Sequence, residues 1–327
     1  MTERIIACCD LGGTKMLAGL MTPDGKLLAY EKYALGSRID PDSVIADLDA
    51  CLNRMLAEIG RLRQDLAVLG FSCTGVLNVE RGWVYMNNNM GWLDVPFREM
   101  VSERSGIPVV LEMDANAAAL GEFWMGQARG YDSFAFVIVG TGVGAGLILK
   151  GEVWRGANGT ANEIGHTVIV PNGPLCSCGK HGCLEALCSG LAIARRAEAA
   201  VTLGRKTSLK THTGSISGQH VADAARAGDE VAQEIFNEAA FYLGIGLSNL
   251  ITVINPQAIV LGGGVGAGAF DLINVPLNRA VQQHLNYWSM RDTPVLRASL
   301  DETAGLYGAA WAALHSLPHP IISEVPK

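Results

Sequence analysis

The residue types best suited to hold a metal are one imidazole and three thiols that lie close together in the chain. His166 is followed by Cys176, Cys178 and Cys183, with glycines placed between the thiols. A Cys₃His set is a common tetrahedral arrangement for structural zinc, and glycine permits the tight turns that bring the sulfurs together. We therefore predict that these four residues hold one zinc ion.

The alternative for a free thiol is burial as a small apolar side chain. The other five cysteines fit that role because they lie in apolar or helical stretches: Cys8, Cys9, Cys51, Cys73 and Cys188. Three thiols for the metal and five for the core account for all eight cysteines. Reduced thiols are typical of the cytoplasm, which is the location that we expect.

Two carboxylates, Glu163 and Glu185, bracket the predicted zinc cluster. Carboxylates accept hydrogen bonds from hydroxyl groups, and a zinc-bound His166 keeps one ring nitrogen for the same purpose. This group of acceptors favours a polyol or a sugar as the substrate.

Glycine-rich turns follow three apolar segments and expose backbone N–H groups that can bind phosphate. A single turn of this kind is weak support, because glycine after a strand usually makes only a tight turn, and the Walker pattern is absent. Three turns together favour a nucleotide. Their residues are Gly12, Gly13, Thr14, Gly140, Thr141, Gly142, Gly262, Gly263 and Gly264.

Two aspartates lie where strands are expected to end. Asp10 could hold Mg²⁺ through water or cap the following turn, and both roles stay open. Asp114 lies at the start of an alanine-rich helix. It could be the N-cap of this helix, a general base facing a substrate hydroxyl, or both. The helix N-terminus should lower the pKa of this carboxylate and keep it ionised at neutral pH.

The composition limits the partners that are expected. The net charge of −7, with no block of Lys or Arg, argues against nucleic acid. No apolar run reaches the length of a membrane span. Met1 leads directly into a strand-like run, so we expect no secretory signal. A chain of 327 residues with 49% hydrophobic content is long enough for two lobes.

The hydrophobic pattern predicts an alternation of strands and helices. Expected strands cover residues 5–9, 16–21, 26–33, 66–73, 107–111, 133–139, 147–150 and 258–261. Expected helices cover 41–63, 114–124, 221–252 with an interruption near 228–229, and 303–314, and 204–218 is an expected loop. Strand, Gly/Thr loop and strand occur twice, about 130 residues apart, which predicts a duplicated architecture with one phosphate loop in each lobe.

Taken together, the motifs resemble those of the ROK family (repressor, open reading frame, kinase). The matching pieces are Asp10–Lys15, Asn89–Trp92, Asp114–Ala119, Gly140–Gly146, Glu163-x-x-His166, the Cys176-to-Glu185 zinc motif and Gly262–Gly264. The resemblance implies an α/β fold of the two-lobed, actin-like ATPase (ribonuclease H-like) type, with a cleft for nucleotide and sugar between the lobes. It also implies ATP- and Mg²⁺-dependent phosphorylation of a hexose in carbohydrate metabolism, by a homodimer or homotetramer.

Residue roles also follow from the resemblance. It implies that Asp114 is the base and that Lys15 and Gly144 join the glycine turns at ATP. It places Gly75, Asn89, Glu163, His166 and Glu185 at the sugar or in support of it. We expect a smaller lobe at 1–112, a larger lobe with the zinc loop at 113–309, and a C-terminal helix at about 310–327 that packs back on the smaller lobe.

The chain departs from the family pattern at Met113. Family glucokinases often have Asn at this position, where it contacts a sugar hydroxyl, whereas a thioether accepts poorly and cannot donate. We therefore expect a related hexose or a sugar acid to be accepted besides or instead of glucose. Asn87 and Asn88 are candidates for the missing polar contact.

Two alternatives belong to other functional classes. A sugar-responsive repressor of the same family carries a DNA-binding helix-turn-helix before the first phosphate loop, and only nine residues precede Asp10 here. A catalytically inactive sugar-binding protein would not need Asp114 or both phosphate loops. We therefore expect a sugar kinase, with the sugar and the preferred phosphoryl donor left open.

Overall fold

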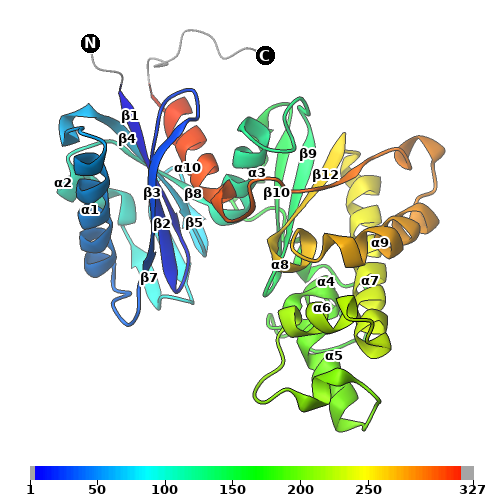
Figure 1. The fold of residues 1–327 in the computed structure, drawn as a ribbon. Coiled ribbons are helices and arrows are strands. Elements are labelled where there is room, and N and C mark those ends of the chain that lie inside the picture. The colour runs from blue at the N-terminus through cyan, green and yellow to red at the C-terminus, as the bar shows by residue number, and fades with distance from the viewer. Residues whose placement is uncertain (1–3, 318–327) are drawn as a thin grey trace. The chain divides into compact units, whose positions relative to one another are not determined.

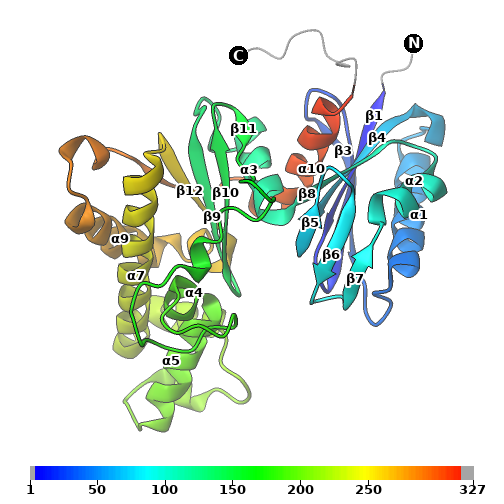
Figure 2. The ribbon, with the colours of Figure 1, turned by 180° about the vertical axis from the view of Figure 1, so that it is seen from behind.

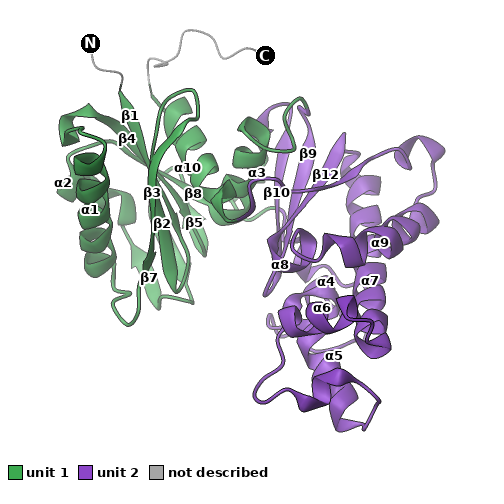
Figure 3. Cartoon of the chain, in the orientation of Figure 1, with its two compact units in different colours: residues 1–130, 153–161, 302–327 green, residues 131–152, 162–301 purple. Residues whose placement is uncertain are grey.

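The computed structural model describes residues 4–317, and these form two compact α/β units (Figure 1). Unit 1 comprises residues 1–130, 153–161 and 302–327, and unit 2 comprises 131–152 and 162–301 (Figure 3). No helix in the described part of the chain combines the length and the hydropathy that a membrane span requires.

Unit 1 is built on a five-stranded sheet with the strand order β3-β2-β1-β4-β8. The strands are β1 (Ile5–Leu11), β2 (Lys15–Met21), β3 (Leu27–Ala34), β4 (Leu66–Cys73) and β8 (Val109–Met113). β1 and β2 form an antiparallel hairpin, while β1, β4 and β8 run parallel. Both faces of β1 and β4 are buried, which explains their continuous apolar sequences.

Helices cover both faces of this sheet. α1 (Pro41–Glu58) and α2 (Phe97–Ser105) share a core with one set of β1 side chains, and α10 (Ala304–His315) packs on the alternate set. Asp40 caps α1, because its carboxylate accepts from the Ser43 amide at 2.9 Å. The helix ends five residues before the predicted end at Arg63, since Gly60 adopts a φ of +65°.

A second, small sheet in unit 1 was not predicted from the sequence. It consists of β5 (Val76–Asn78), β6 (Trp83–Asn87) and β7 (Trp92–Val95), joined in the order β5-β6-β7 (Figure 2). The 3₁₀ turn η1 (Arg63–Asp65) leads into β4. The small sheet carries the asparagine run that the sequence analysis singled out.

Unit 2 repeats the topology of unit 1, which confirms the predicted duplication. Its sheet has the order β11-β10-β9-β12-β13, again with an antiparallel hairpin beside parallel strands. The strands are β9 (Phe134–Val139), β10 (Val143–Leu149), β11 (Glu152–Val153), β12 (Ala258–Gly262) and β13 (Val295–Arg297). β10 begins at Val143, so the turn is confined to residues 140–142, because Val143 already pairs with Val139.

The helices of unit 2 pack around one large apolar core. They are α4 (Leu184–Cys188), α5 (Gly190–Thr202), α6 (Gly218–Arg226), α7 (Glu230–Ile254), α8 (Gly263–Gly266) and α9 (Phe270–His284), with the 3₁₀ turns η2 (Ile164–His166), η3 (Ser208–Thr211), η4 (Trp288–Met290) and η5 (Asp301–Thr303). The predicted interruption near 228–229 separates α6 from α7, which Asp229 caps. The expected loop at 204–218 contains η3, because Leu209 is buried.

α10 packs against α3 (Asp114–Trp124) with their backbones in contact. A side chain at Gly308 would place its first carbon 1.6 Å from the Ala117 carbonyl oxygen, and one at Gly121 would lie 2.2 Å from that of Ala304. This packing assigns α3 to unit 1, so the compact units differ from the lobes expected at 1–112 and 113–309. α10 confirms the helix expected at 303–314. Residues 318–327 of the helix expected at about 310–327 lie outside the described part.

Candidate functional site

In unit 1, the carboxylate of Asp10 lies at the end of β1 beside Ser72 of β4. The Ser72 hydroxyl donates to it at 2.5 Å. Burial raises the pKa of Asp10, while the Ser72 hydrogen bond and the charge of Lys15 act in the opposite direction. The following turn is closed by a backbone bond from Gly12 N to Lys15 O at 3.0 Å. A backbone bond therefore closes this turn, and the ion-binding role of Asp10 stays a prediction.

A small pocket opens beside this carboxylate. It has a volume of about 50 Å³ and is lined by Asp10, Gly12, Lys15, Leu17, Lys32 and Glu302. The Nζ atoms of Lys15 and Lys32 lie 3.5 and 2.7 Å from the same oxygen of Glu302. The pocket thus holds two cations, both paired with Glu302, beside the partly buried carboxylate of Asp10. Cations and carboxylates are the groups that bind a phosphate and a hydrated metal ion.

The asparagine run lies over the glycine turn of unit 1. A side chain at Gly13 would meet the Asn89 Cβ at 2.5 Å. Asn87 is buried and donates to the backbone and side-chain oxygens of Thr74, at 3.0 and 3.1 Å, and its own oxygen accepts from the Asn89 amide at 3.1 Å. Asn87 is therefore a support for Asn89 and Thr74 and is already engaged in the protein.

Gly75 follows Thr74 and adopts a φ of +111°, with the Met86 carbonyl oxygen 2.3 Å from where a side chain would begin. This strained, crowded turn requires glycine. It brings the backbone of β5 close to the asparagine run on β6. Gly75 and Asn89, both implied by the resemblance, thus lie in one neighbourhood of unit 1.

Asp114 is the first residue of α3 rather than its N-cap, because Met113 holds the extended cap conformation. One carboxylate oxygen of Asp114 accepts from the Ala115 amide at 2.8 Å. The charge of a carboxylate in the first helical turn is still favoured by the helix dipole. Met113 pairs with Cys73 of β4 and is partly buried against the core of unit 1.

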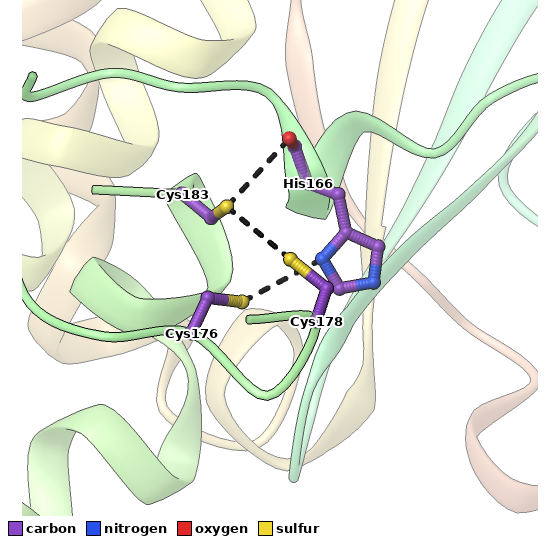
Figure 4. Close-up of side chains that lie close together, drawn as sticks. All are labelled: His166, Cys176, Cys178 and Cys183. Atoms are coloured by element: carbon purple, nitrogen blue, oxygen red, sulfur yellow. Dashed lines mark hydrogen bonds between the residues drawn. The ribbon is translucent and has the colours of Figure 1, made fainter. Parts of the chain in front are cut away.

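In unit 2, the predicted ligands converge as expected from the sequence. One ligand atom from each of His166, Cys176, Cys178 and Cys183 lies within 4.8 Å of every other (Figure 4). The eight cysteines all lie in the described residues and none forms a disulfide. The five cysteines assigned to the core are buried.

The spacing of the ligand atoms fits a tetrahedral metal. Bond lengths of about 2.3 Å to sulfur and about 2.0 Å to nitrogen place ligand sulfurs about 3.8 Å apart, and sulfur about 3.5 Å from nitrogen. The Cys178 and Cys183 sulfurs are 3.7 Å apart, and the Cys176 sulfur is 3.6 Å from His166 Nδ1. Nδ1 is therefore the nitrogen that faces the sulfurs, and Nε2 points toward Glu163, whose Oε2 is 4.0 Å away.

Glu185, two residues after Cys183, ties the zinc loop to the glycine turn of unit 2. Its Oε2 accepts from the Val143 amide at 3.1 Å, and Oε1 accepts from the Ser177 hydroxyl at 2.7 Å. A side chain at Gly142 would lie 2.5 Å from Oε2. Glu185 thus contacts the glycine turn of unit 2, a position that sequence reasoning did not assign to it.

The other glycines of unit 2 pack around the same turn. Gly263 adopts a φ of +83°, and a side chain there would meet the Val139 carbonyl oxygen at 2.5 Å. A side chain at Gly262 would meet the ring of Phe136. The Gly190 amide donates to Gly140 O at 2.7 Å. Gly144 lies within β10, and its amide is part of the sheet rather than of the turn. Gly140–Gly142 and Gly262–Gly264 therefore lie at neighbouring strand ends.

Comparison with known proteins places the chain among sugar kinases. The ROK family profile matches residues 6–316. A glucokinase of Streptomyces coelicolor is 35% identical over 96% of this chain and 98% of its own length, and a glucokinase of Halalkalibacterium halodurans is 31% identical over 95% of each chain. The solved structure of a ROK family glucokinase from Streptomyces griseus, in complex with glucose and AMPPNP, is 34% identical. It covers 94% of this chain and 99% of its own, with a TM-score of 0.79.

The duplicated sheets and these likenesses define a two-lobed, actin-like ATPase fold. Within that class, the chain belongs to the ROK family.

Proposed function

We propose that this chain catalyses the ATP-dependent phosphorylation of a hexose or a closely related sugar, with Asp114 as the general base. It is a sugar kinase, and the observation that carries this conclusion is its near full-length likeness to ROK glucokinases. The site geometry within each unit supports the assignment of individual residues.

Asp114 supports the chemical step because it opens α3 directly after β8. A carboxylate at a helix N-terminus stays ionised near neutral pH and can accept the proton of the attacking hydroxyl. Phosphoryl transfer otherwise depends on positioning and on neutralising charge. Gly75 and Asn89 in unit 1, with Glu163 and the Nε2 atom of His166 in unit 2, are the proposed partners of the sugar. Glu185 supports them through the zinc loop.

The nucleotide is assigned to the turns that expose backbone amides. In unit 1 these are Gly12, Gly13 and Thr14, with Lys15 as a cation, and in unit 2 Thr141, Gly142 and the run Gly262–Gly264. Asp10 would hold Mg²⁺ through water, and its partly buried carboxylate in the unit 1 pocket fits that ion. When bound, Mg²⁺ neutralises charge on the phosphates. Gly144 contributes through the geometry of β10 and not through a free amide.

The zinc proposal rests on the Cys₃His geometry of unit 2. A structural zinc would fix the loop that carries Glu185, and with it the contact to the Val143 amide. A metal bound at Nδ1 leaves Nε2 of His166 for a substrate hydroxyl. The free thiols support a reducing, cytoplasmic location, and a dimeric or tetrameric assembly remains part of the proposal.

A coupled assay of ADP release tests this function. The chain is mixed with ATP, Mg²⁺ and one sugar at a time: glucose, mannose, N-acetylglucosamine, N-acetylmannosamine or a sugar acid. We expect sugar-dependent ADP release with at least one hexose and little release without sugar. ADP release that no sugar stimulates would contradict the proposal.

A further inference from the structure

A buried carboxylate that the mechanism has not used lies two residues before Asp114. Glu112, on β8, is 1% exposed. Its Oε1 accepts from the Met113 amide at 3.0 Å and from Asn116 Nδ2, in the first turn of α3, at 3.1 Å. Its Oε2 accepts from Nη2 of Arg155. Glu112 therefore joins the strand end and the helix start that together carry Asp114.

Arg155 is the partner that makes burial of this carboxylate tolerable. It is the sole Lys or Arg within residues 153–161, its side chain is 40% exposed, and its Nε atom is buried without a hydrogen-bond partner. Removing one member of a buried ion pair leaves an uncompensated charge, so each member needs the other. The partial exposure of Arg155 softens this penalty without removing it.

The segment that carries Arg155 belongs to unit 1, although the chain on either side of it belongs to unit 2. The Ala161 amide donates to the Arg155 carbonyl oxygen at 3.2 Å, which closes the segment into a compact loop. The chain leaves this loop at Asn162, and Glu163 and His166 follow immediately. An anchored Arg155 thus fixes the start of the stretch that bears two proposed sugar partners.

We propose that Arg155 is a positioning residue for the sugar. Its ion pair with Glu112 fixes the point at which the backbone enters the Glu163–His166 stretch. The inference rests on the proposed kinase function. Arg155 acts through Glu112 on the side of Asp114 and through Ala161 on the side of Glu163. Misplacement of a substrate-holding group by about 1 Å lowers turnover roughly 10²-fold, so loss of the pair should affect the sugar more than ATP.

Steady-state kinetics of Arg155→Ala, Arg155→Lys and Glu112→Gln test the proposal. We expect kcat/KM for the sugar to fall at least tenfold in Arg155→Ala and Glu112→Gln, with KM for ATP within twofold of the wild type. Arg155→Lys keeps the charge without the planar fork and should recover part of the loss. The matched control is Arg205→Ala, which breaks the exposed Arg205–Glu234 pair in unit 2 and should stay within twofold.

Trypsin provides a readout that does not depend on turnover. Cleavage after Arg155 requires its side chain to leave Glu112, so Glu112→Gln should speed cleavage at the Arg155–Gly156 bond at least fivefold, measured by mass spectrometry. Unchanged cleavage, or an Arg155→Ala variant with wild-type sugar kcat/KM per folded molecule, would overturn the inference. If Glu112→Gln does not fold, Arg155→Lys still decides, because the inference requires its sugar kcat/KM to fall and wild-type kinetics would overturn it.

The two proposals fail in different ways. A wild-type chain that phosphorylates no sugar would end the proposed function, while trypsin would still report on the pair. If the wild type is active and neither Arg155→Ala nor Glu112→Gln changes the kinetics for the sugar, only this inference is wrong.

Discussion

The glycine turns of the two units have the same topology and hold their carboxylates differently. In unit 1, Asp10 belongs to β1 itself, and its neighbour Ser72 comes from the adjoining strand. In unit 2, the hairpin of β9 and β10 has no acidic residue of its own, and Glu185 is supplied from α4. Glu185 lies two residues after Cys183 of the predicted zinc cluster.

This difference shows two ways to position an acid beside a phosphate-type turn. A carboxylate on a central strand is fixed by sheet pairing and core packing. A carboxylate on a short helix needs another constraint, and the proposed zinc with its four ligands would provide it. We therefore expect activity to fall when single side chains of unit 1 are replaced. In unit 2, we expect activity to depend on whether the proposed metal is bound.

Asp114→Asn should have the largest effect. It removes the proposed base from unit 1 while keeping the size and the helix position of the side chain. Loss of a general base typically lowers kcat about 10²–10⁴-fold, with little change in sugar affinity by calorimetry. Asp42→Asn, in the first turn of α1, is the matched control and should keep full activity. Near-wild-type turnover in Asp114→Asn would end the assignment.

Loss of the metal should act indirectly, through unit 2. We expect elemental analysis to give one zinc per chain, and Cys178→Ser to lose it. Because Glu185 would then lose its fixed position beside Val143, kcat/KM for ATP should fall at least tenfold. Cys188→Ala, which removes a core thiol from α4, should retain the zinc. A metal-free wild type with full activity and freely titratable thiols would contradict the comparison.

Met113→Asn tests the sugar side of unit 1. A site built to hydrogen-bond a hydroxyl rejects analogues that lack it, whereas an apolar wall does not. We expect the wild type to accept several hexoses and the variant to shift its kcat/KM ratio toward glucose on the order of tenfold. A glucose-specific wild type and an unchanged ratio in the variant would make Met113 a packing residue only.

Asp10→Asn also tests the pKa of this carboxylate through the stability of the ligand-free chain, where we expect the smallest of these shifts. Burial raises the pKa of Asp10, so the folded chain holds its proton more tightly than the unfolded chain does. Between the unfolded and the folded pKa, the contribution of this group to stability therefore declines as pH rises. The Tm of ligand-free Asp10→Asn should exceed that of the wild type at pH 8, and the difference should vanish near pH 4.

The control for this measurement is Asp24→Asn. Asp24 is exposed, and the Thr22 hydroxyl lowers its pKa, so its removal should not raise the Tm at pH 8. An Asp10→Asn variant with no gain over the wild type at pH 8 would contradict the pKa argument.

Features that depend on neighbours in the chain were predictable from the sequence. The predicted zinc ligands span few residues, and glycine within that span permits the tight turns that bring them together, so their convergence follows from spacing. Both strand–turn–strand units were found because apolar runs alternate with glycine turns. The family resemblance placed Gly144 with the glycine turns at ATP, yet pairing of its strand with β9 decides its conformation.

Long-range pairs were not predictable in this way. Glu185 and Val143 are separated by 42 residues, and Arg155 and Glu112 by 43. Sequence pattern carries no signal for such contacts, because they follow from how whole segments pack. For the same reason, α3 could not be assigned to unit 1 before its packing against α10 was known.

The backbone-to-backbone packing of α10 also sets an order of events during synthesis. Unit 2 is complete once residue 301 has emerged from the ribosome, whereas unit 1 lacks its closing helix until residues 304–315 follow. Until then, the β4 surface around Gly70, where an added side-chain carbon would lie 2.0 Å from the Ala309 carbonyl oxygen, is open to other apolar chains. The N-terminal part of unit 1 is thus translated first, but unit 1 completes its fold last. Nascent chains stalled before residue 304 should therefore depend most on chaperones.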